Sequence, residues 1–262
     1  MMRALSTAAT GMEAQQYNVD TISNNIANVN TTGFAANLAK FQDLIYQNLR
    51  APGTPVGNSI VPVGQDVGLG VKVGSSEKMF QQGTLQETDN PLDVAIEGQG
   101  FFQVTLPDGT TAYTRDGSFK VDPNGQITTA DGYFLNPQIT VPATATQVQI
   151  GSDGTVSATI PGQQLPQTLG QIQLVRFINP AGLSPQGDNL YLQTGASGAP
   201  TISQPGLNGA GTLQGGYLEQ SNVSVVTEMV NLITAQRAYE ANSKSVTTAD
   251  SMLQTAVQMK TS

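Results

Sequence analysis

Residues 5–29 read LSTAATGMEAQQYNVDTISNNIANV, and apolar side chains recur in this stretch at intervals of seven residues. One row is Leu5, Met12, Val19 and Ile26, and the row beside it is Ala8, Gln15, Ile22 and Val29. This spacing is typical of a helix that packs against another helix. We therefore expect a helix from about Met2 to Val29, stopped by the turn-forming residues 30–33 and by Gly33.

The C-terminal end carries a matching pattern. One row is Val225, Leu232, Tyr239, Val246 and Leu253, and a second row of smaller residues is Ala235, Asn242, Ala249 and Ala256. Small side chains let two helix backbones approach closely. The intervening positions hold Asn, Gln, Ser and Thr more often than Lys and Glu, which suits a hydrated interface with other helices. We expect Ser221 or Asn222 to cap this second helix.

Two interpretations of the paired ends remain open. Apolar stripes at helical spacing usually belong to a core, so the helices could form an ordinary antiparallel pair that closes a monomeric domain. A lone pair of long helices with narrow stripes is only marginally stable, however, and neighbouring subunits could supply further partners. The pattern favours a homo-polymer whose ends are largely disordered in the monomer. The predicted assembly residues are Leu5, Met12, Val19, Ile22, Ile26, Val29, Leu232, Ala235, Tyr239, Val246 and Leu253.

Residues 34–75 are expected to connect the first helix to the middle of the chain. Apolar residues at Leu38, Phe41, Leu44, Ile45 and Leu49 fit either a short helix or an extended segment. Residues 51–70 contain three prolines and five glycines, which exclude a helix. This stretch is either a flexible linker or an extended arm that packs on the next subunit. The candidate arm residues are Pro52, Pro55, Val61, Val63, Val67 and Leu69.

The middle of the chain alternates short apolar segments with turn dipeptides, which predicts antiparallel hairpins. The turn dipeptides are Asp108-Gly109, Asp116-Gly117, Asn124-Gly125, Asp131-Gly132 and Asp153-Gly154. The predicted strands are 94–96, 100–106, 112–114, 119–121, 126–129, 132–135, 147–151, 156–159 and 171–177. The fold class is therefore α+β, with terminal helices packed as a coiled-coil-like pair around an inserted, mainly antiparallel β domain. We expect a helical domain of 1–33 plus 221–262, an arm of 34–75 and a β-rich outer domain of 76–220.

Composition limits the possible functions. The chain has 262 residues, no cysteine, and a net charge of -8 without a cluster of Lys and Arg, so we expect neither disulfides nor binding to nucleic acid. Charged residues are only 11% of the chain, which leaves a largely neutral polar surface. No stretch approaches the roughly twenty apolar residues of a membrane span, and the N-terminus lacks the features of a cleaved signal peptide.

The usual catalytic patterns are weak or missing. Histidine is absent, which removes the commonest general base and most transition-metal sites. Asp89, Asp93 and Glu97 are close in sequence, but 89–91 is more typical of a turn than of a glycosidase pair. Ser75 to Lys78 matches Ser-x-x-Lys without its companion motifs, and Asp122 to Gly125 fits a hairpin turn better than a calcium loop. We expect no catalytic residue, cofactor, metal or small-molecule substrate.

Four segments carry distinctive residue patterns. Residues 22–34, ISNNIANVNTTGF, and 235–242, AQRAYEAN, are similar to the N-terminal and C-terminal signatures of the bacterial flagellar rod and hook family. Residues 89–102, DNPLDVAIEGQGFF, and 113–119, YTRDGSF, resemble its central motif. The family commonly has a lysine after Gly-Phe, whereas this chain has Ala35 and Ala36. The resemblance covers nearly the whole chain.

The resemblance implies a structural subunit rather than an enzyme. Length and the arm favour the distal rod, a rigid tube that surrounds the export channel, crosses the outer periplasm and transmits torque to the hook. The implied partners are copies of the chain, proximal rod proteins, the hook protein, the surrounding ring proteins and the flagellar type III export apparatus, which would export it without a cleaved signal peptide. The nearest alternative is a hook-type or proximal rod subunit. A secreted adhesin would not need paired heptads, and a muramidase would need a carboxylate pair in a cleft.

Overall fold

The computed structural model describes residues 2–53, 55–56, 59–60, 62–163 and 165–261. The chain forms two compact units. The first consists of Met1–Ala27, Asn37–Glu77 and Ser224–Ser262, and the second of Asn28–Ala36 and Lys78–Val223. We expected residues 34–75 to form a separate arm, whereas residues 37–77 group with the two helices. The division into an inner and an outer domain of an assembly stays a prediction.

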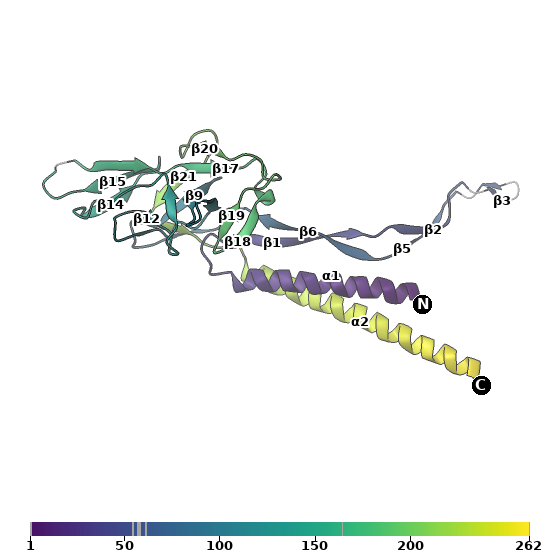
Figure 1. Ribbon diagram of the computed structural model, residues 1–262. Coiled ribbons are helices and arrows are strands. Elements are labelled where there is room, and N and C mark those ends of the chain that lie inside the picture. The colour runs from purple at the N-terminus through teal and green to yellow at the C-terminus, as the bar shows by residue number, and fades with distance from the viewer. Residues whose placement is uncertain (1, 54, 57–58, 61, 164, 262) are drawn as a thin grey trace. The chain divides into compact units, whose positions relative to one another are not determined.

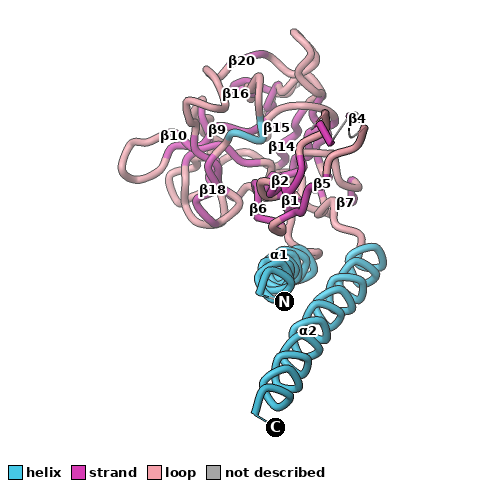
Figure 2. The backbone as a smooth tube through the Cα atoms, turned by 90° about the vertical axis from the view of Figure 1, so that its right-hand side faces the viewer, coloured by secondary structure: helices cyan, strands magenta, loops and turns pink. Residues whose placement is uncertain are grey.

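Two antiparallel helices dominate the first unit, and they confirm the predicted terminal pair (Figure 1). Helix α1 spans Met2–Ala27 and helix α2 spans Val225–Thr261. Helix α1 ends two residues before the expected Val29, because the chain turns at 28–34, where Thr31 N–H donates to the carbonyl of Asn28 and Gly33 has a φ of 66°. The two helices separate toward the C-terminal end of α2 (Figures 1 and 2).

The predicted cap of α2 was wrong. The helix starts after Ser224, whose carbonyl accepts the N–H of Glu228 at 2.9 Å. The Ser221 hydroxyl instead accepts the N–H of Val223 at 3.3 Å, and Asn222 bonds to two other segments of the chain. These side chains order the connection that precedes the helix, so neither is available as its cap.

The segment whose conformation was undecided forms a long β-ribbon. Strand β1 (Ala36–Asp43) pairs with β6 (Val71–Met79), β2 (Tyr46–Arg50) with β5 (Gln65–Gly68), and β3 (Pro55–Val56) with β4 (Ser59–Ile60). The helical alternative for residues 38–49 was therefore wrong. The pairing of β2 with β5 favours the extended arm over the flexible linker. The aromatic ring of Tyr46 covers Gly68 of the opposite strand, which has no side chain of its own.

The second unit is built from short antiparallel strands. Its main sheet has the order β11-β12-β13-β9-β10-β19-β18, and β17 pairs with both β9 and β20. Smaller sheets contain β14-β15-β16, β21-β8 and β22-β7. The elements are β7 Leu85–Glu87, β8 Val94–Glu97, β9 Phe101–Thr105, β10 Thr111–Thr114, β11 Lys120–Val121, β12 Ile127–Thr128, β13 Phe134–Asn136, β14 Gln147–Ile150, β15 Thr155–Thr159, β16 Gln167–Gln171, β17 Leu174–Arg176, the 3-10 helix η1 Pro180–Gly182, β18 Ser184–Gly187, β19 Leu190–Leu192, β20 Thr201–Ser203, β21 Thr212–Gly215 and β22 Tyr217–Glu219.

The predicted strands from residue 94 to residue 159 all contain a strand, shifted by one or two residues at most of the ends. The expected strand 171–177 is instead divided, because β16 ends at Gln171 and β17 starts at Leu174. Strands after residue 177 were not predicted, since they are short and lie among Gly, Pro and Ser. The α+β class with an inserted antiparallel β domain is confirmed.

Strand β9 is the centre of the β core. Successive side chains of a strand point to opposite faces, and Phe101 and Phe102 accordingly lie in two different buried clusters. Phe102 packs edge-on against Phe119 at 5.1 Å between ring centroids, in the cluster that contains Ile96, Leu135 and Leu174. Burial on both faces explains why two large apolar residues, Phe101 and Phe102, follow one another at the start of this strand. None of the described helices is long and apolar enough to cross a membrane.

Four of the five predicted turn dipeptides hold their glycine in the left-handed region, at Gly109, Gly125, Gly132 and Gly154. Gly117 is different. A Cβ atom on Gly117 would lie 1.7 Å from the carbonyl oxygen of Val94. The N–H of Val94 in turn donates to the carbonyl of Gly117. Glycine is needed here for the close approach of two backbones rather than for a tight turn.

Candidate assembly surfaces

The contact between α1 and α2 is made largely by small side chains. The buried residues of the predicted rows are Ala8, Ile22, Ala235 and Ala249. A Cβ atom on Gly11 would lie 2.8 Å from the side-chain nitrogen of Asn242, so the two helices approach closely here. Half-buried residues of the predicted assembly set are Leu5, Met12, Val19, Ile26, Val29, Leu232, Val246 and Leu253, whereas Tyr239 is exposed. The pair therefore leaves much of its apolar surface accessible.

Asn25 and Ala14 are also buried in the first unit, although neither was among the predicted assembly residues. The side-chain oxygen of Asn25 accepts the N–H of Asn37 at 2.8 Å, and its nitrogen donates to the carbonyl of Asn37 at 2.9 Å. A buried amide is stable only with such partners. Its position three residues after Ile22, on the same helix face, was the signal available in the sequence.

Two open grooves follow the helix pair. One, of about 410 Å³, lies between α1, α2 and β1, and amide side chains such as Gln15, Asn18 and Asn231 line it beside Leu38 and Phe41. The other, of about 380 Å³, is lined by Gln16, Val19, Gln236, Tyr239 and Glu240. Both grooves combine apolar surface with hydrogen-bonding side chains, most of which are neutral, as a hydrated helix interface requires.

A second apolar stripe covers the opposite face of α2, and we call it the outer stripe. It consists of Val226, Met229, Val230 and Ile233, which are 75%, 55%, 58% and 58% exposed. Their spacing places them on one side of the helix, opposite the buried Ala235. Beyond Arg237 this side becomes polar, with Lys244 and Thr248. Because α1 packs on the other side, the outer stripe has no cover within the described part of the first unit.

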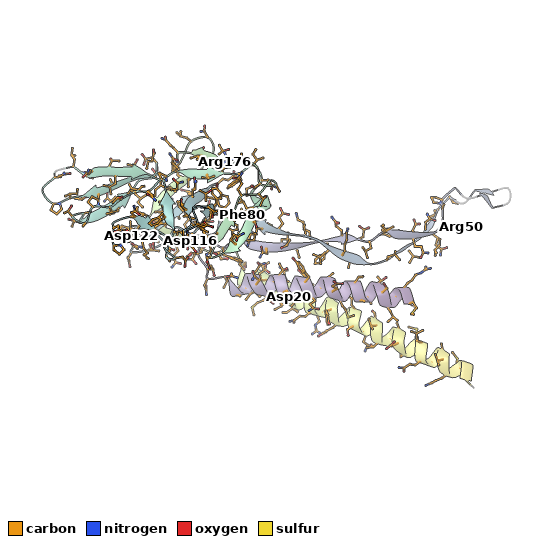
Figure 3. The ribbon with its side chains drawn as sticks, in the orientation of Figure 1. Asp20, Arg50, Phe80, Asp116, Asp122 and Arg176 are labelled. Atoms are coloured by element: carbon orange, nitrogen blue, oxygen red, sulfur yellow. The ribbon has the colours of Figure 1, made fainter. Side chains whose placement is uncertain are left out.

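The ribbon is also apolar and exposed. Of the predicted arm residues, Pro52, Val63 and Leu69 are exposed, Val67 is half-buried and Pro55 lies in β3, whereas Val61 is outside the described residues. Ile45, Tyr46 and Leu49 are exposed as well, and they were not among the predicted arm residues. Arg50 ends strand β2 (Figure 3). Near the helices, a Cβ atom on Gly70 would collide with Thr10, whose hydroxyl accepts the N–H of Val71 at 3.4 Å.

Two of the recognised sequence segments meet in the second unit. The hydroxyl of Thr32 donates to Asp116 at 3.1 Å, and the side chain of Asn189 donates to the carbonyl of Thr32 at 3.0 Å. Asp116 lies in the loop that follows β10 (Figure 3). A Cβ atom on Gly33 would lie 2.7 Å from the backbone nitrogen of Asp116. Residues 32–33 are thus fitted tightly against residues 115–116.

A buried ion pair lies beside this contact. The side chain of Arg115 donates to Glu219 at 2.8 Å, and both side chains are almost completely buried. Arg115 also donates to the carbonyls of Gly98 and Gly100, at 3.0 and 3.3 Å. These contacts satisfy a charge that would otherwise be costly to bury.

Within the second unit, the side chain of Lys78 lies beside Phe34 and Ala35. Its ammonium group is 5.0 Å from the ring centroid of Phe34 and 3.5 Å from the carbonyl of Ala35. Burial lowers the pKa of Lys78 from its usual value. The ring of Tyr191 lies 5.8 Å from the same ammonium, and burial raises the pKa of Tyr191 to about 12, against the opposing charge of Arg115.

The residues that could suggest catalysis are not brought together. A groove of about 610 Å³ in the second unit contains Asp89. Asp93, however, is buried and accepts a hydrogen bond from Asn90, while exposed Glu97 accepts one from Gln214. Ser75 and Lys78 are three positions apart on β6, which places them on opposite faces. Asp122 accepts the N–H groups of Asn124 and Gln126, which confirms the hairpin turn (Figure 3).

Comparison with known proteins gives matches along the whole chain. Residues 5–34 match the model of the flagella basal body rod protein, 95–158 that of the flagellar hook protein FlgE/F/G D1 domain, and 214–259 that of the flagellar basal body rod FlgEFG protein C-terminal. The terminal helices, the exposed ribbon and the inserted β unit thus define a structural subunit of the flagellar rod and hook class.

Individual relatives identify the family within this class to which the chain belongs. The flagellar basal-body rod protein FlgG of Caulobacter vibrioides is 52% identical over 99% of this chain and 100% of its own length. That of Borreliella burgdorferi is 52% identical over 99% of both, and that of Bacillus subtilis is 40% identical over 99% of this chain and 100% of its own length. The chain belongs to the family of the flagellar basal-body rod protein FlgG. It is a structural protein of the flagellar basal body.

Proposed function

We propose that this chain polymerises through its first unit into the rigid tube of the distal rod, which transmits torque to the hook and surrounds the export channel. The observation that carries the proposal is the outer stripe of α2. Together with α1 packing on the other side, it gives α2 apolar surface on two faces, and a helix that is apolar on two sides requires partners on both. In the tube, a neighbouring copy would cover the outer stripe.

The size of the outer stripe favours a polymer over a dimer. Fully burying one such side chain is worth about 1.5–3 kcal/mol, so four that are more than half exposed contribute on the order of 4 kcal/mol. Association costs at least about 4 kcal/mol in lost translational and rotational freedom. A single contact of this kind therefore barely offsets its cost, and stable binding requires several neighbours for each subunit.

Charge supports contacts through the first unit. Eleven of the nineteen acidic residues but only four of the eleven basic residues lie in the second unit, which therefore carries -7 of the net charge of -8. Like charges on neighbouring β units repel one another. The first unit is nearly neutral, so copies can pack closely there.

The ribbon would bridge neighbouring subunits through its exposed residues Ile45, Tyr46, Leu49 and Val63. Helices alone can slide past one another, whereas an apolar arm that reaches a neighbour fixes its position, which gives the tube its stiffness. The proposed partners are further copies of the chain, the proximal rod proteins, the hook protein, the surrounding ring proteins and the type III export apparatus. The proposed location is the periplasmic part of the rod, reached without a cleaved signal peptide, and the proposed role is structural, without catalysis.

A charge placed in the outer stripe tests assembly. We expect Val230→Asp to prevent rod formation because a carboxylate in this interface would be desolvated without a partner. Thr248→Asp is the matched control, since Thr248 is exposed, lies on the same side of α2 five turns further along and is outside the stripe. The measurement is electron microscopy of rods from cells that produce each variant. Normal rods with Val230→Asp would contradict the proposed interface.

The position in the flagellum is tested by electron cryotomography of cells that lack the gene. A motor whose rod ends as a stub in the periplasm, without a hook, is the expected result. A full-length rod that lacks only its hook would assign the chain to the hook side instead. Intact flagella would contradict any role in the rod.

A further inference from the structure

Three connections meet at one place in the second unit. They are residues 28–36, which follow α1, residues 78–83, which follow most of β6, and residues 219–223, which precede α2. The hydrogen bonds of Glu219 and Asn222 that join these connections all lie within the second unit. The first connection joins α1 to β1, the second follows β6 and the third leads to α2, so any load passed along the chain between the units crosses one of the three.

Glu219 bonds to the other two connections and to the β core. Its main-chain carbonyl accepts the N–H of Gly33 at 2.8 Å. One carboxylate oxygen accepts the N–H of Gly83 at 3.0 Å, and the other accepts the side chain of Arg115 at 2.8 Å. Charge-assisted bonds in a buried site are strong and directional. Glu219 therefore fixes the first and second connections to the strand that leads toward α2.

Asn222 repeats this arrangement three residues later. Its side-chain oxygen accepts the N–H of Ala36 at 2.8 Å. Its side-chain nitrogen donates to the carbonyls of Met79 and Gln81, at 2.7 and 3.0 Å. An asparagine side chain offers two N–H donors and one acceptor oxygen. It can therefore bond to all three of these partners, one backbone N–H and two backbone carbonyls, at the same time. No other side chain of similar size supplies the same set in this position.

We infer that Glu219 and Asn222 form a joint, defined as these two residues with Gly33, Ala36, Met79, Gln81 and Gly83, that holds the three connections together against torsion. This inference rests on the proposed function, because a torsional load exists only in a rotating rod. Glu219 and Asn222 act as positioning residues. The joint uses directional hydrogen bonds and one ion pair, which resist displacement in specific directions, whereas the apolar contacts of the helix pair allow sliding.

Amide exchange of the purified full-length chain tests whether these groups act as one joint. In Asn222→Ala we expect the amides of Gly33, Ala36 and Gly83 all to exchange about tenfold faster or more, although Asn222 bonds directly only to Ala36 among them. Asn222→Asp keeps the acceptor for Ala36 but loses both donated bonds, so it should release Gly83 and leave Ala36 protected. Asn124→Ala, the same change in an exposed turn, should alter none of the three. Faster exchange of Ala36 alone in Asn222→Ala would overturn the joint.

Swimming under load tests the torsional role separately. Cells that produce Asn222→Ala should build rods and swim normally in dilute medium, but lose speed in viscous medium relative to cells that produce Asn124→Ala. A merely structural defect would lower rod number and speed equally in both media, and that result, or a complete loss of rods, would overturn the torsional role. The exchange measurement needs no flagellum, so failure of the joint and failure of the proposed function are distinguishable.

Discussion

Gly33 is the residue whose replacement should harm the second unit most directly. It combines a φ of 66° with a predicted Cβ position only 2.7 Å from the nitrogen of Asp116, so an added methyl group meets backbone atoms that cannot move freely. We expect Gly33→Ala to lower the free energy of unfolding by about 2–4 kcal/mol, from backbone strain and overpacking together. Urea unfolding of the full chain, monitored on the β unit, measures this.

Gly109→Ala is the matched control for Gly33. Gly109 has a φ of 83°, but nothing lies within 4 Å of its added Cβ atom. Only the strain of the left-handed conformation remains, which is about 1 kcal/mol. An equal loss of stability in both variants would show that crowding against residues 115–116 is not important.

Tyr191 should make stability fall at high pH. Burial raises its pKa from 10.0 to about 12, so between these values the folded chain keeps a proton that the unfolded chain loses. The free energy of unfolding therefore falls as pH rises from about 10 to 12, by about 2–3 kcal/mol in total. The lowered pKa of Lys78 has the opposite effect and makes the free energy of unfolding rise with pH, but only below about pH 10.5, the usual pKa of lysine.

Denaturant unfolding at pH 9.5 and pH 12 measures this loss. Tyr191→Phe should remove most of it, and a smaller slope should remain because burial also raises the pKa of Tyr113. Tyr17→Phe replaces an exposed tyrosine of α1, and it should leave the fall in unfolding free energy between the two pH values unchanged. If the unfolding free energy of Tyr191→Phe fell with pH as much as that of the unchanged chain, groups other than Tyr191 would cause the loss.

Residues with a local role were easier to predict than residues with distant partners. The turn glycines at 109, 125, 132 and 154 were predicted because an Asx-Gly dipeptide has its own conformational preference. The roles of Asn25 and Asn222 were not. Asn222 bonds to Ala36, which is 186 positions away in the sequence, and no pattern within either segment indicates that contact. The wrong capping assignment of Asn222 followed from considering only its neighbours.

At the scale of elements, periodicity identified both helices and most strands, but it did not decide the ribbon. Leu38, Phe41, Ile45 and Leu49 are spaced by three or four residues, which is a helical interval, yet they lie in or beside paired strands. Pairing with residues 65–79 decided the conformation, and that information lies outside the segment. The ends of α1 and α2 shifted by a few residues for the same reason, since the connections bond to the β unit.

Shortening the ribbon should make the rod flexible without unfolding its subunits. A variant in which residues 51–64 are replaced by Asn-Gly would join β2 directly to β5 through a two-residue turn. It removes Val63 and the β3–β4 pair while β1 and β6 remain. We expect rods that still form but bend, seen as a shorter persistence length in electron micrographs.

Replacing only Val63 by Thr, which keeps the ribbon length, is the control for that deletion. It should change the rod much less, because one β-branched side chain replaces another of similar size. Rods as straight as those of the unchanged chain, formed by the shortened variant, would contradict the stiffening role of the ribbon.

On the scale of the whole molecule, the two units have different sources of stability. The second unit has buried aromatic and aliphatic clusters around β9 that hold its strands together. The first unit has an interface in which alanines account for many of the buried apolar residues, and α2 is eleven residues longer than α1. The additional residues correspond to about 16 Å of helix. The exposed residues Met252, Val257 and Met259 lie near the C-terminal end of α2.

This contrast predicts that the terminal helices are largely disordered in the dilute monomer and fold on assembly. Ordering a residue costs about 1–2 kcal/mol of backbone entropy, and burying small side chains returns little free energy in exchange. Hydrogen exchange of dilute full-length chain should therefore show weak protection across residues 5–29 and strong protection in β8 and β9, which serve as the internal control. The same measurement on assembled rods should show protection in both regions. Strong protection of residues 5–29 in the monomer would instead support an ordinary antiparallel pair that is stable before any neighbour binds.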